Sequence, residues 1–304
     1  MVSLARIGVF NVLRHTAACR SLTTHVSEQS SHRHANLIRT CYEKLDGCYQ
    51  RAIPGLKPYP VPAIIDTNWD KNFTVLWDRL PHDDDTYACC MARGIKYNEH
   101  RVGNPQFTLY IHGAYVHPTY RGRGICAALV GDEADVLKQQ LGPNVDISIQ
   151  FFASGFNNEN SGRMFWAKMG AEFTYENGRR IFLANCRQWA NDLDTSLFAS
   201  PVRTALHDMF DDAEKTVEKN GVPVINSPWI LFQLIEQIEK SYKKHRISDA
   251  SLIKNFSTHL TSSNGVSWHG TIPIQPAPEG GSPFWGQVAA ARKLRSQFEK
   301  KSSN

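Results

Sequence analysis

One stretch of the chain decides the fold: residues 110–129 read YIHGAYVHPTYRGRGICAAL. The residues before Pro118 are mostly apolar and aromatic, which predicts a buried strand. Pro118 then ends the strand, because proline has no backbone N–H to donate to a neighbouring strand. Gly122 and Gly124 let the backbone turn sharply and approach a ligand closely, and a helix is expected from about Ile125. The first-turn N–H groups of such a helix attract an anion, so the stretch predicts a phosphate-binding turn.

This turn resembles the acyl-CoA pyrophosphate loop of the GNAT superfamily of N-acyltransferases, which is written Gln/Arg-x-x-Gly-x-Gly/Ala. Arg121 fills the first position and Gly124 the fourth, whereas Cys126 stands at the sixth, where the family has glycine or alanine. The P-loop and G-x-G-x-x-G patterns are absent from the sequence. A tight basic turn that binds no ligand is the alternative. The resemblance implies that acetyl-CoA is bound as a co-substrate by residues around the turn: Val116, Arg121, Gly122, Arg123, Gly124, Ile125, Cys126 and Ala127.

Residues 158–170 resemble the last helix of a GNAT domain, in which an aromatic residue lies four positions before a glycine. Trp166 holds that position before Gly170, and the resemblance places Ser161 and Trp166 beside the cofactor. Many members of the family use a tyrosine on this helix to protonate the departing thiolate, which an indole N–H does not do. Tyr115, Ser161 or water are the expected substitutes.

The strand before the turn holds the expected catalytic groups. Residues 110, 112, 114 and 116 share one face of a regular strand. The family places a glutamate or histidine base at the positions of Tyr110 and His112, so His112 is the candidate base for the attacking amine. A core histidine bonded to a backbone carbonyl is the alternative. The backbone near Tyr115 and Val116 is expected to bind pantetheine and the thioester oxygen.

Strands alternate with helices through residues 73–185, which predicts a mixed α/β sheet of the GNAT kind. The resemblance covers about residues 29–190, which we expect to form the N-acetyltransferase domain. The expected elements are a hairpin of residues 73–80 and 86–94, a helix over 125–141 ended by Gly142, a strand over 145–152, and a closing hairpin of 172–175 and 180–184 around Asn177-Gly178.

Residues 191–304 have a different character and are expected to form a helical C-terminal region. Three helix starts share one pattern, a capping serine followed by proline: Ser200-Pro201, Ser227-Pro228 and Ser282-Pro283. Residues 265–281, rich in proline and glycine, predict an extended connector. The basic end from Arg292 to Lys301 predicts a solvated helix face.

Residues 1–28 are expected to be a leader. They carry Arg6, Arg14 and Arg20 and no acidic residue before Glu28. This composition resembles a mitochondrial transit peptide. A first strand of the fold, a disordered arm or the secretion signal of an acyltransferase delivered into another cell are the alternatives, and without targeting a cytoplasmic location is expected.

Composition limits the other classes of protein. The chain has 304 residues, 41% hydrophobic and 21% charged, which is typical of one large or two ordinary globular domains. A net charge of +5 suits an anionic ligand, while no long basic run or RNA-binding motif indicates nucleic acid. No segment approaches the ~18 apolar residues of a membrane span. The seven cysteines form no C-x-x-C, which predicts reduced thiols in an intracellular compartment and no metal site.

These patterns together predict an N-acetyltransferase that moves the acetyl group of acetyl-CoA to an amine of a small molecule or protein. The amine attacks the thioester directly with help from a general base. A catalytically inactive GNAT-like protein that binds CoA or serves as a scaffold is the alternative. A homo-oligomer is compatible with either.

Overall fold

The computed structural model describes residues 36–37, 40–41, 43–45, 47–48, 58–59, 64–66, 71–80, 83–98, 103–116, 118–153, 162–220, 225–242, 250–262, 265–275 and 282–302. The expected leader over residues 1–28 lies outside these ranges. The chain divides into two compact units, a first unit of Met1–Phe151 with Ile272–Asn304 and a second unit of Phe152–Thr271. These divisions differ from the boundaries placed at residues 28/29 and 190/191 from the sequence, and the limits of the family domain stay a prediction.

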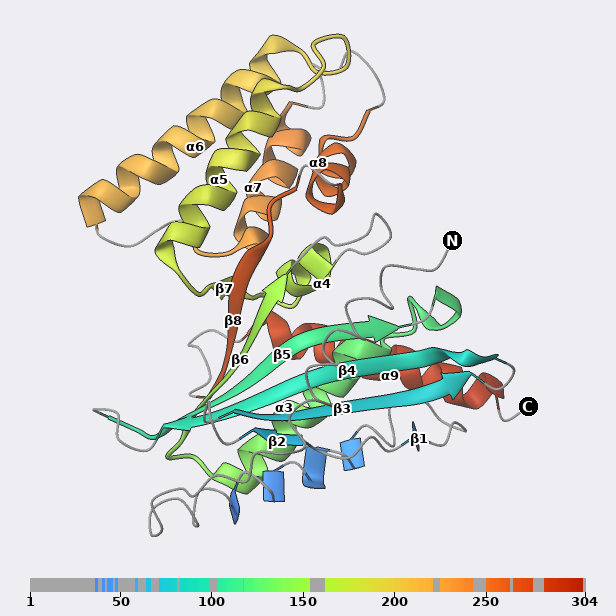
Figure 1. Cartoon of the computed structure of the whole chain (residues 1–304). Coiled ribbons are helices and arrows are strands. Elements are labelled where there is room, and N and C mark those ends of the chain that lie inside the picture. The colour runs from blue at the N-terminus through green and yellow to red at the C-terminus, as the bar shows by residue number, and fades with distance from the viewer. Residues whose placement is uncertain are drawn as a thin grey trace. The chain divides into compact units, whose positions relative to one another are not determined.

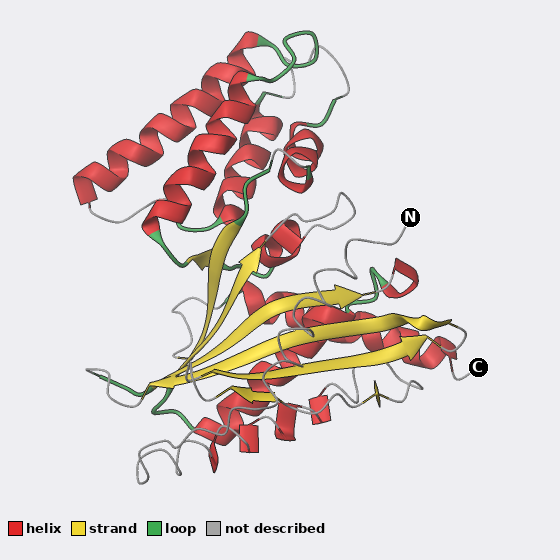
Figure 2. Ribbon diagram, in the orientation of Figure 1, coloured by secondary structure: helices red, strands yellow, loops and turns green. Residues whose placement is uncertain are grey.

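The first unit contains a mixed sheet (Figures 1 and 2). Its strands run in the order β1-β3-β4-β5-β6, and β2 pairs with β3. The pairs β3–β4 and β4–β5 are antiparallel, whereas β5 and β6 are parallel. The bounds are β1 Pro58–Tyr59, β2 Ile64–Asp66, β3 Lys71–Leu80, β4 Asp83–Asn98, β5 Gln106–Val116 and β6 Asp146–Ala153. The predicted mixed α/β fold and its first hairpin are therefore confirmed, except that Asp83–Asp85, expected in the turn, belong to β4.

Helix α3, Ile125–Leu141, connects the parallel strands β5 and β6 and has the predicted bounds. Its apolar face is buried, and so are the alternating residues of β5, Phe107, Leu109 and Ile111. Gly142 ends the helix with φ of 74°, a conformation that glycine adopts without steric strain, and donates its N–H to Lys138. Apolar residues of a helix and a strand thus form one core, as the sequence pattern predicted.

Helix α9, Pro283–Ser302, packs against α3 within the first unit. It begins at the predicted Ser282-Pro283 pair, where the Phe284 N–H donates to Ser282 Oγ at 3.3 Å. Phe284, Val288 and Ala291 recur at helical spacing and are buried. Leu294, which continues this spacing, is 46% exposed.

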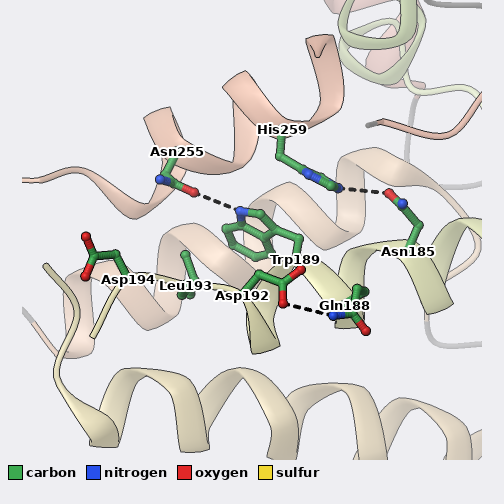
Figure 3. Close-up of a pocket in the computed structure, with 8 residues that line it drawn as sticks. All are labelled: Asn185, Gln188, Trp189, Asp192, Leu193, Asp194, Asn255 and His259. Atoms are coloured by element: carbon green, nitrogen blue, oxygen red, sulfur yellow. Dashed lines mark hydrogen bonds between the residues drawn. The ribbon is translucent and has the colours of Figure 1, made fainter. Parts of the chain in front are cut away.

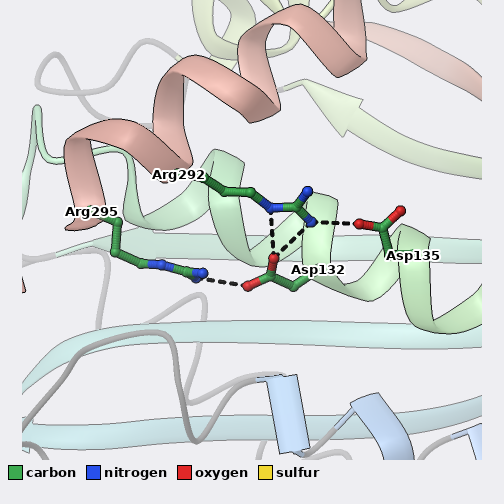
Figure 4. A network of polar contacts seen from close by, with 4 residues as sticks. All are labelled: Asp132, Asp135, Arg292 and Arg295. Atoms are coloured by element: carbon green, nitrogen blue, oxygen red, sulfur yellow. Dashed lines mark hydrogen bonds and ion pairs between the residues drawn. The ribbon is translucent and has the colours of Figure 1, made fainter.

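The basic end of α9 is not a purely solvated face, so that prediction was wrong for two of its arginines. Arg292 donates to Asp132 at 2.9 Å and to Asp135 at 2.7 Å, and Arg295 donates to Asp132 at 2.7 Å (Figure 4). Both aspartates lie on α3. Opposite charges from two helices that are far apart in the sequence therefore form ion pairs. The basic composition of residues 292–301 alone does not indicate these partners.

The second unit is mostly helical. Strand β7 pairs antiparallel with β8, with Glu172 opposite Thr271 and Phe173 opposite Gly270. Ser227 caps α7 through the Ile230 N–H at 3.3 Å, which confirms that Ser-Pro start. Helix α6 begins at the predicted place, but Ser200 is its first helical residue and its role as a cap stays a prediction. The bounds of its helices and of β7 are α4 Gly162–Lys168, β7 Glu172–Phe173, α5 Glu176–Asn191, α6 Ser200–Asn220, α7 Pro228–Ser241 and α8 Leu252–Thr261. Strand β8, Trp268–Gln275, begins in the second unit, and its residues from Ile272 onward belong to the first.

The expected closing hairpin around Asn177-Gly178 was wrong, because helix α5 occupies residues 176–191. Its buried residues recur at helical spacing: Arg179, Phe182, Leu183, Cys186, Trp189 and Ala190. Glu176 in the first turn accepts hydrogen bonds from Arg179 and Arg180, three and four residues later. Side-chain burial and local ion pairs therefore outweigh the turn preference of Asn-Gly.

The expected extended connector over residues 265–281 contains β8, and α8 before it was missed from the sequence. Trp268 of β8 is 1% exposed and packs edge-on against Phe173 at a centroid distance of 5.5 Å. The region 191–304 is thus largely helical but supplies a strand as well. Among the described residues, no helix is long and apolar enough to cross a membrane.

Candidate cofactor site

The loop between β5 and α3 is a compact turn fixed by its own hydrogen bonds. A short 3-10 helix, Pro118–Tyr120, follows β5, and the Arg121 N–H donates to Pro118 O at 3.2 Å. Arg121 Nε donates to Val116 O at 2.9 Å. The side chain of the first motif residue therefore ties the loop to the end of the strand, a role that the sequence pattern did not indicate.

Helix α3 begins at this loop without a side-chain cap. Gly124 is its N-cap residue, with φ of 74°, and its carbonyl accepts the Ala128 N–H at 2.9 Å. Helices α7 and α8, in contrast, are each capped by a serine hydroxyl. Because a glycine cap offers no side-chain acceptor and the helix dipole is positive at this end, the first turn of α3 favours an external anion.

The two loop glycines are required for different reasons. Both have φ of 74°, which strains any residue with a Cβ. A Cβ on Gly122 would meet nothing within 4 Å, so this position is open. A Cβ on Gly124 would lie 2.5 Å from the carbonyl oxygen and 2.8 Å from Cα of Ala291 on α9. Gly124 is therefore needed for helix packing as well as for the turn.

The remaining loop residues surround these glycines. The guanidinium of Arg123 lies 5.4 Å from the ring centroid of Tyr120, an arrangement that orients its charge at the loop. Ile125 is 3% exposed and anchors the first turn of α3 in the core. Cys126 and Ala127 are half-buried. The loop thus presents two arginines, an open glycine and an uncapped helix start in one place.

Strand β5 changes its pairing next to this loop. Its ladder with β6 runs from Gln106–Asp146 to Ile111–Phe151, while residues 112–116 continue only along β4 in the described registers. The β4 register shifts so that Ala92 faces Gly113 and Arg93 faces Ile111, which leaves residue 112 as the extra residue of a bulge. On the side of β5 that faces away from β4, pairing with β6 therefore ends at Ile111, a few residues before the loop.

The bulge affects the expected catalytic residues. It interrupts the two-residue alternation, so Tyr110 and Ala114 need not share a face. Tyr110 is half-buried on β5. The side chains of His112 and Tyr115 lie outside the described part of the structure. Their roles stay predictions.

The two expected cofactor residues from the last family helix are not part of this loop. Trp166 lies on α4 in the second unit, where it is 5% exposed and packs edge-on against Phe165 at 4.8 Å. Ser161 lies outside the described residues. The structure thus brings Val116 and residues 121–127 together in the first unit, and contact of Ser161 and Trp166 with the cofactor stays a prediction.

A buried ion pair beneath the loop helix was missed from the sequence. Arg93 of β4 pairs with Glu133 of α3, and both side chains are fully buried. A sequence signal existed, because Glu133 is spaced four residues from both Leu129 and Leu137 on the buried face of the helix. Such a pair fixes the helix against the strand, since either charge alone would be strongly destabilising there.

No group of three or more histidine, cysteine, aspartate or glutamate residues suited to a metal ion occurs among the described residues. Cys41 and Cys186 are buried free thiols. The chain matches no curated protein. Residues 38–170 match the model of the acetyltransferase (GNAT) family, a range that includes β5, the loop, α3 and α4. The match supports an acetyltransferase (GNAT) domain over this part of the chain and an acyltransferase in general.

Proposed function

We propose that the protein is an N-acetyltransferase that transfers the acetyl group of acetyl-CoA to an amine of a small molecule or a protein. One observation carries the proposal. Within the family match, a loop with two arginines and two positive-φ glycines leads into a helix whose N-cap has no side chain. This combination suits the pyrophosphate of an acyl-CoA.

The chemistry would use the residues around this loop in sequence. The first turn of α3 and the loop arginines hold the pyrophosphate, which fixes one end of the co-substrate. The pantetheine then extends along β5 beyond Ile111, where the strand has left the β6 ladder. A β5 backbone N–H there stabilises the oxyanion as the amine nitrogen bonds to the thioester carbon. His112 accepts the proton that the amine loses, the C–S bond breaks, and the leaving thiolate takes a proton from Tyr115, Ser161 or water.

A CoA-binding protein without transfer activity is the second candidate. Trp166 favours it, because a buried indole stands where many family members have an acidic tyrosine. An assay of free thiol released from acetyl-CoA, run with a panel of amines and peptides, distinguishes the two candidate functions. Acetyl-CoA should raise the melting temperature in both cases. Thiol release that depends on the amine supports transfer, and binding without release supports the second candidate.

We further propose a mitochondrial location, on the arginine-rich, acid-free composition of residues 1–27. A fusion of residues 1–30 to a fluorescent protein should enter mitochondria in a eukaryotic cell. Diffuse cytosolic fluorescence would contradict this proposal and leave the enzymatic proposal untouched.

A further inference from the structure

The second unit contains a pocket of its own, with a volume of about 430 Å3. It lies between the C-terminal half of α5, the turn that follows it and helix α8 (Figure 3). A cavity of this size accommodates a small organic ligand. All of the residues that line it belong to residues 185–259, so it is formed entirely within the second unit.

Hydrogen bonds hold the polar walls of the pocket in place. The indole N–H of Trp189 donates to Asn255 Oδ1 at 2.8 Å, which joins α5 to α8. His259 Nε2 lies 2.8 Å from Asn185 Oδ1 and joins the same two helices. Figure 3 shows these side chains with the two bonds between the helices. A wall fixed in this way before binding loses little entropy when a ligand enters.

The pocket is acidic. Asp192 and Asp194 both line it, and no lysine or arginine is among its described lining residues. The Ser196 hydroxyl and N–H donate to Asp194 and hold the pKa of its carboxyl below the ordinary value. Burial lowers the pKa of His259, Arg163 lowers it further and Asp192 partly offsets this, so the imidazole is neutral at pH 7. The lining therefore carries carboxylates without a compensating positive charge.

We propose that this pocket binds an organic cation, a protonated primary amine carried on an apolar stem. The ammonium group pairs with the carboxylates of Asp192 and Asp194, whose hydrogen bonds from Gln188 and Ser196 leave one oxygen of each carboxylate for it. The stem lies against Leu193 and the ring of Trp189, which also attracts a cation at its face. A bare metal ion fits less well, because the described residues contain no group of three metal-ligating side chains. This proposal is independent of the acetyl-transfer reaction.

Three six-carbon probes with a cationic, a neutral and an anionic head group test the proposal: n-hexylamine, n-hexanol and hexanoate. Each is titrated into the full-length protein with 15N-labelled tryptophan, and the indole resonance of Trp189 is identified by its absence in Trp189→Phe. Hexylamine should shift this resonance in a saturable way. Hexanol should bind about tenfold more weakly, because it cannot form the charge-assisted hydrogen bonds, and hexanoate should not bind.

Two isosteric substitutions provide the matched comparison. Asp192→Asn with Asp194→Asn should weaken hexylamine binding by about tenfold or more. Asp208→Asn, an exposed aspartate on α6 that does not line the pocket, removes charge elsewhere and should leave the affinity unchanged. An unshifted Trp189 resonance in the ligand-free variants verifies folding. A wild-type protein that shows no saturable shift with hexylamine, or binds hexylamine and hexanol equally, would overturn the proposal.

Discussion

Replacing Gly124 with alanine should destabilise the first unit more than the same replacement at Gly122. The two glycines share φ of 74°, so each substitution carries the same left-handed strain of about 1 kcal/mol. Only the Cβ at residue 124 meets backbone atoms of α9, at 2.5 Å and 2.8 Å. A helix backbone cannot move aside as a flexible side chain does, so the clash adds about 1–3 kcal/mol of overpacking.

Differential scanning calorimetry of the two variants measures this difference directly. For a unit of this size, about 2–4 °C of melting temperature corresponds to each kcal/mol, so Gly124→Ala should melt about 2–12 °C below Gly122→Ala. The shared strain cancels in the comparison. Equal melting temperatures would refute the close packing of α9 on the loop. Gly124 would then be required only for its positive φ angle.

Three further outcomes are expected. Acetyl-CoA should slow alkylation of the half-buried Cys126, followed by peptide mass spectrometry; Cys41, whose pKa burial raises to about 11, should stay unlabelled with or without the ligand. His112→Ala should lower turnover by about 10²–10⁴ with little change in acetyl-CoA affinity, and a loss of stability alone would identify a core histidine. Because the folded-state pKa of His259 is lowered, the unfolded chain binds the extra proton first, so stability should fall as the pH drops below about 6.5. His259→Gln should reduce that loss in urea denaturation at pH 7 and pH 5, and an unchanged pH dependence would contradict it.

The elements predicted correctly are those whose start, buried face and end are all determined by residues close together in the sequence. Helix α3 has a glycine at each end and an apolar face between them, and both bounds agree with the structure. The hairpin of β3 and β4 has alternating residues on both sides of a polar turn. The serine-proline starts are equally local, since the capping hydroxyl and the N–H that it accepts are three residues apart in α7.

The elements predicted badly depend on partners elsewhere in the chain. Arg292 appears solvated until Asp132 and Asp135 are brought beside it. Asn177-Gly178 favours a turn, but the helix that contains it is stabilised by burial of Phe182 and Trp189. The bulge at residue 112 arises from the register of two paired strands, which one strand's sequence does not specify. Side-chain geometry around His112 therefore cannot be derived from alternation.

The packing of α9 on α3 has a consequence for synthesis of the chain on the ribosome. Residues 152–271 are continuous, so the second unit can fold as soon as they emerge. The first unit is split, because its final helix follows that whole segment in the sequence. Until residues 283–302 are made, the surface of α3 at Gly124 and Gly131, which Ala291 and Val288 of α9 cover, stays exposed. A nascent chain thus holds an incomplete first unit until α9 is made, and a stop before residue 283 would destabilise residues that were made much earlier.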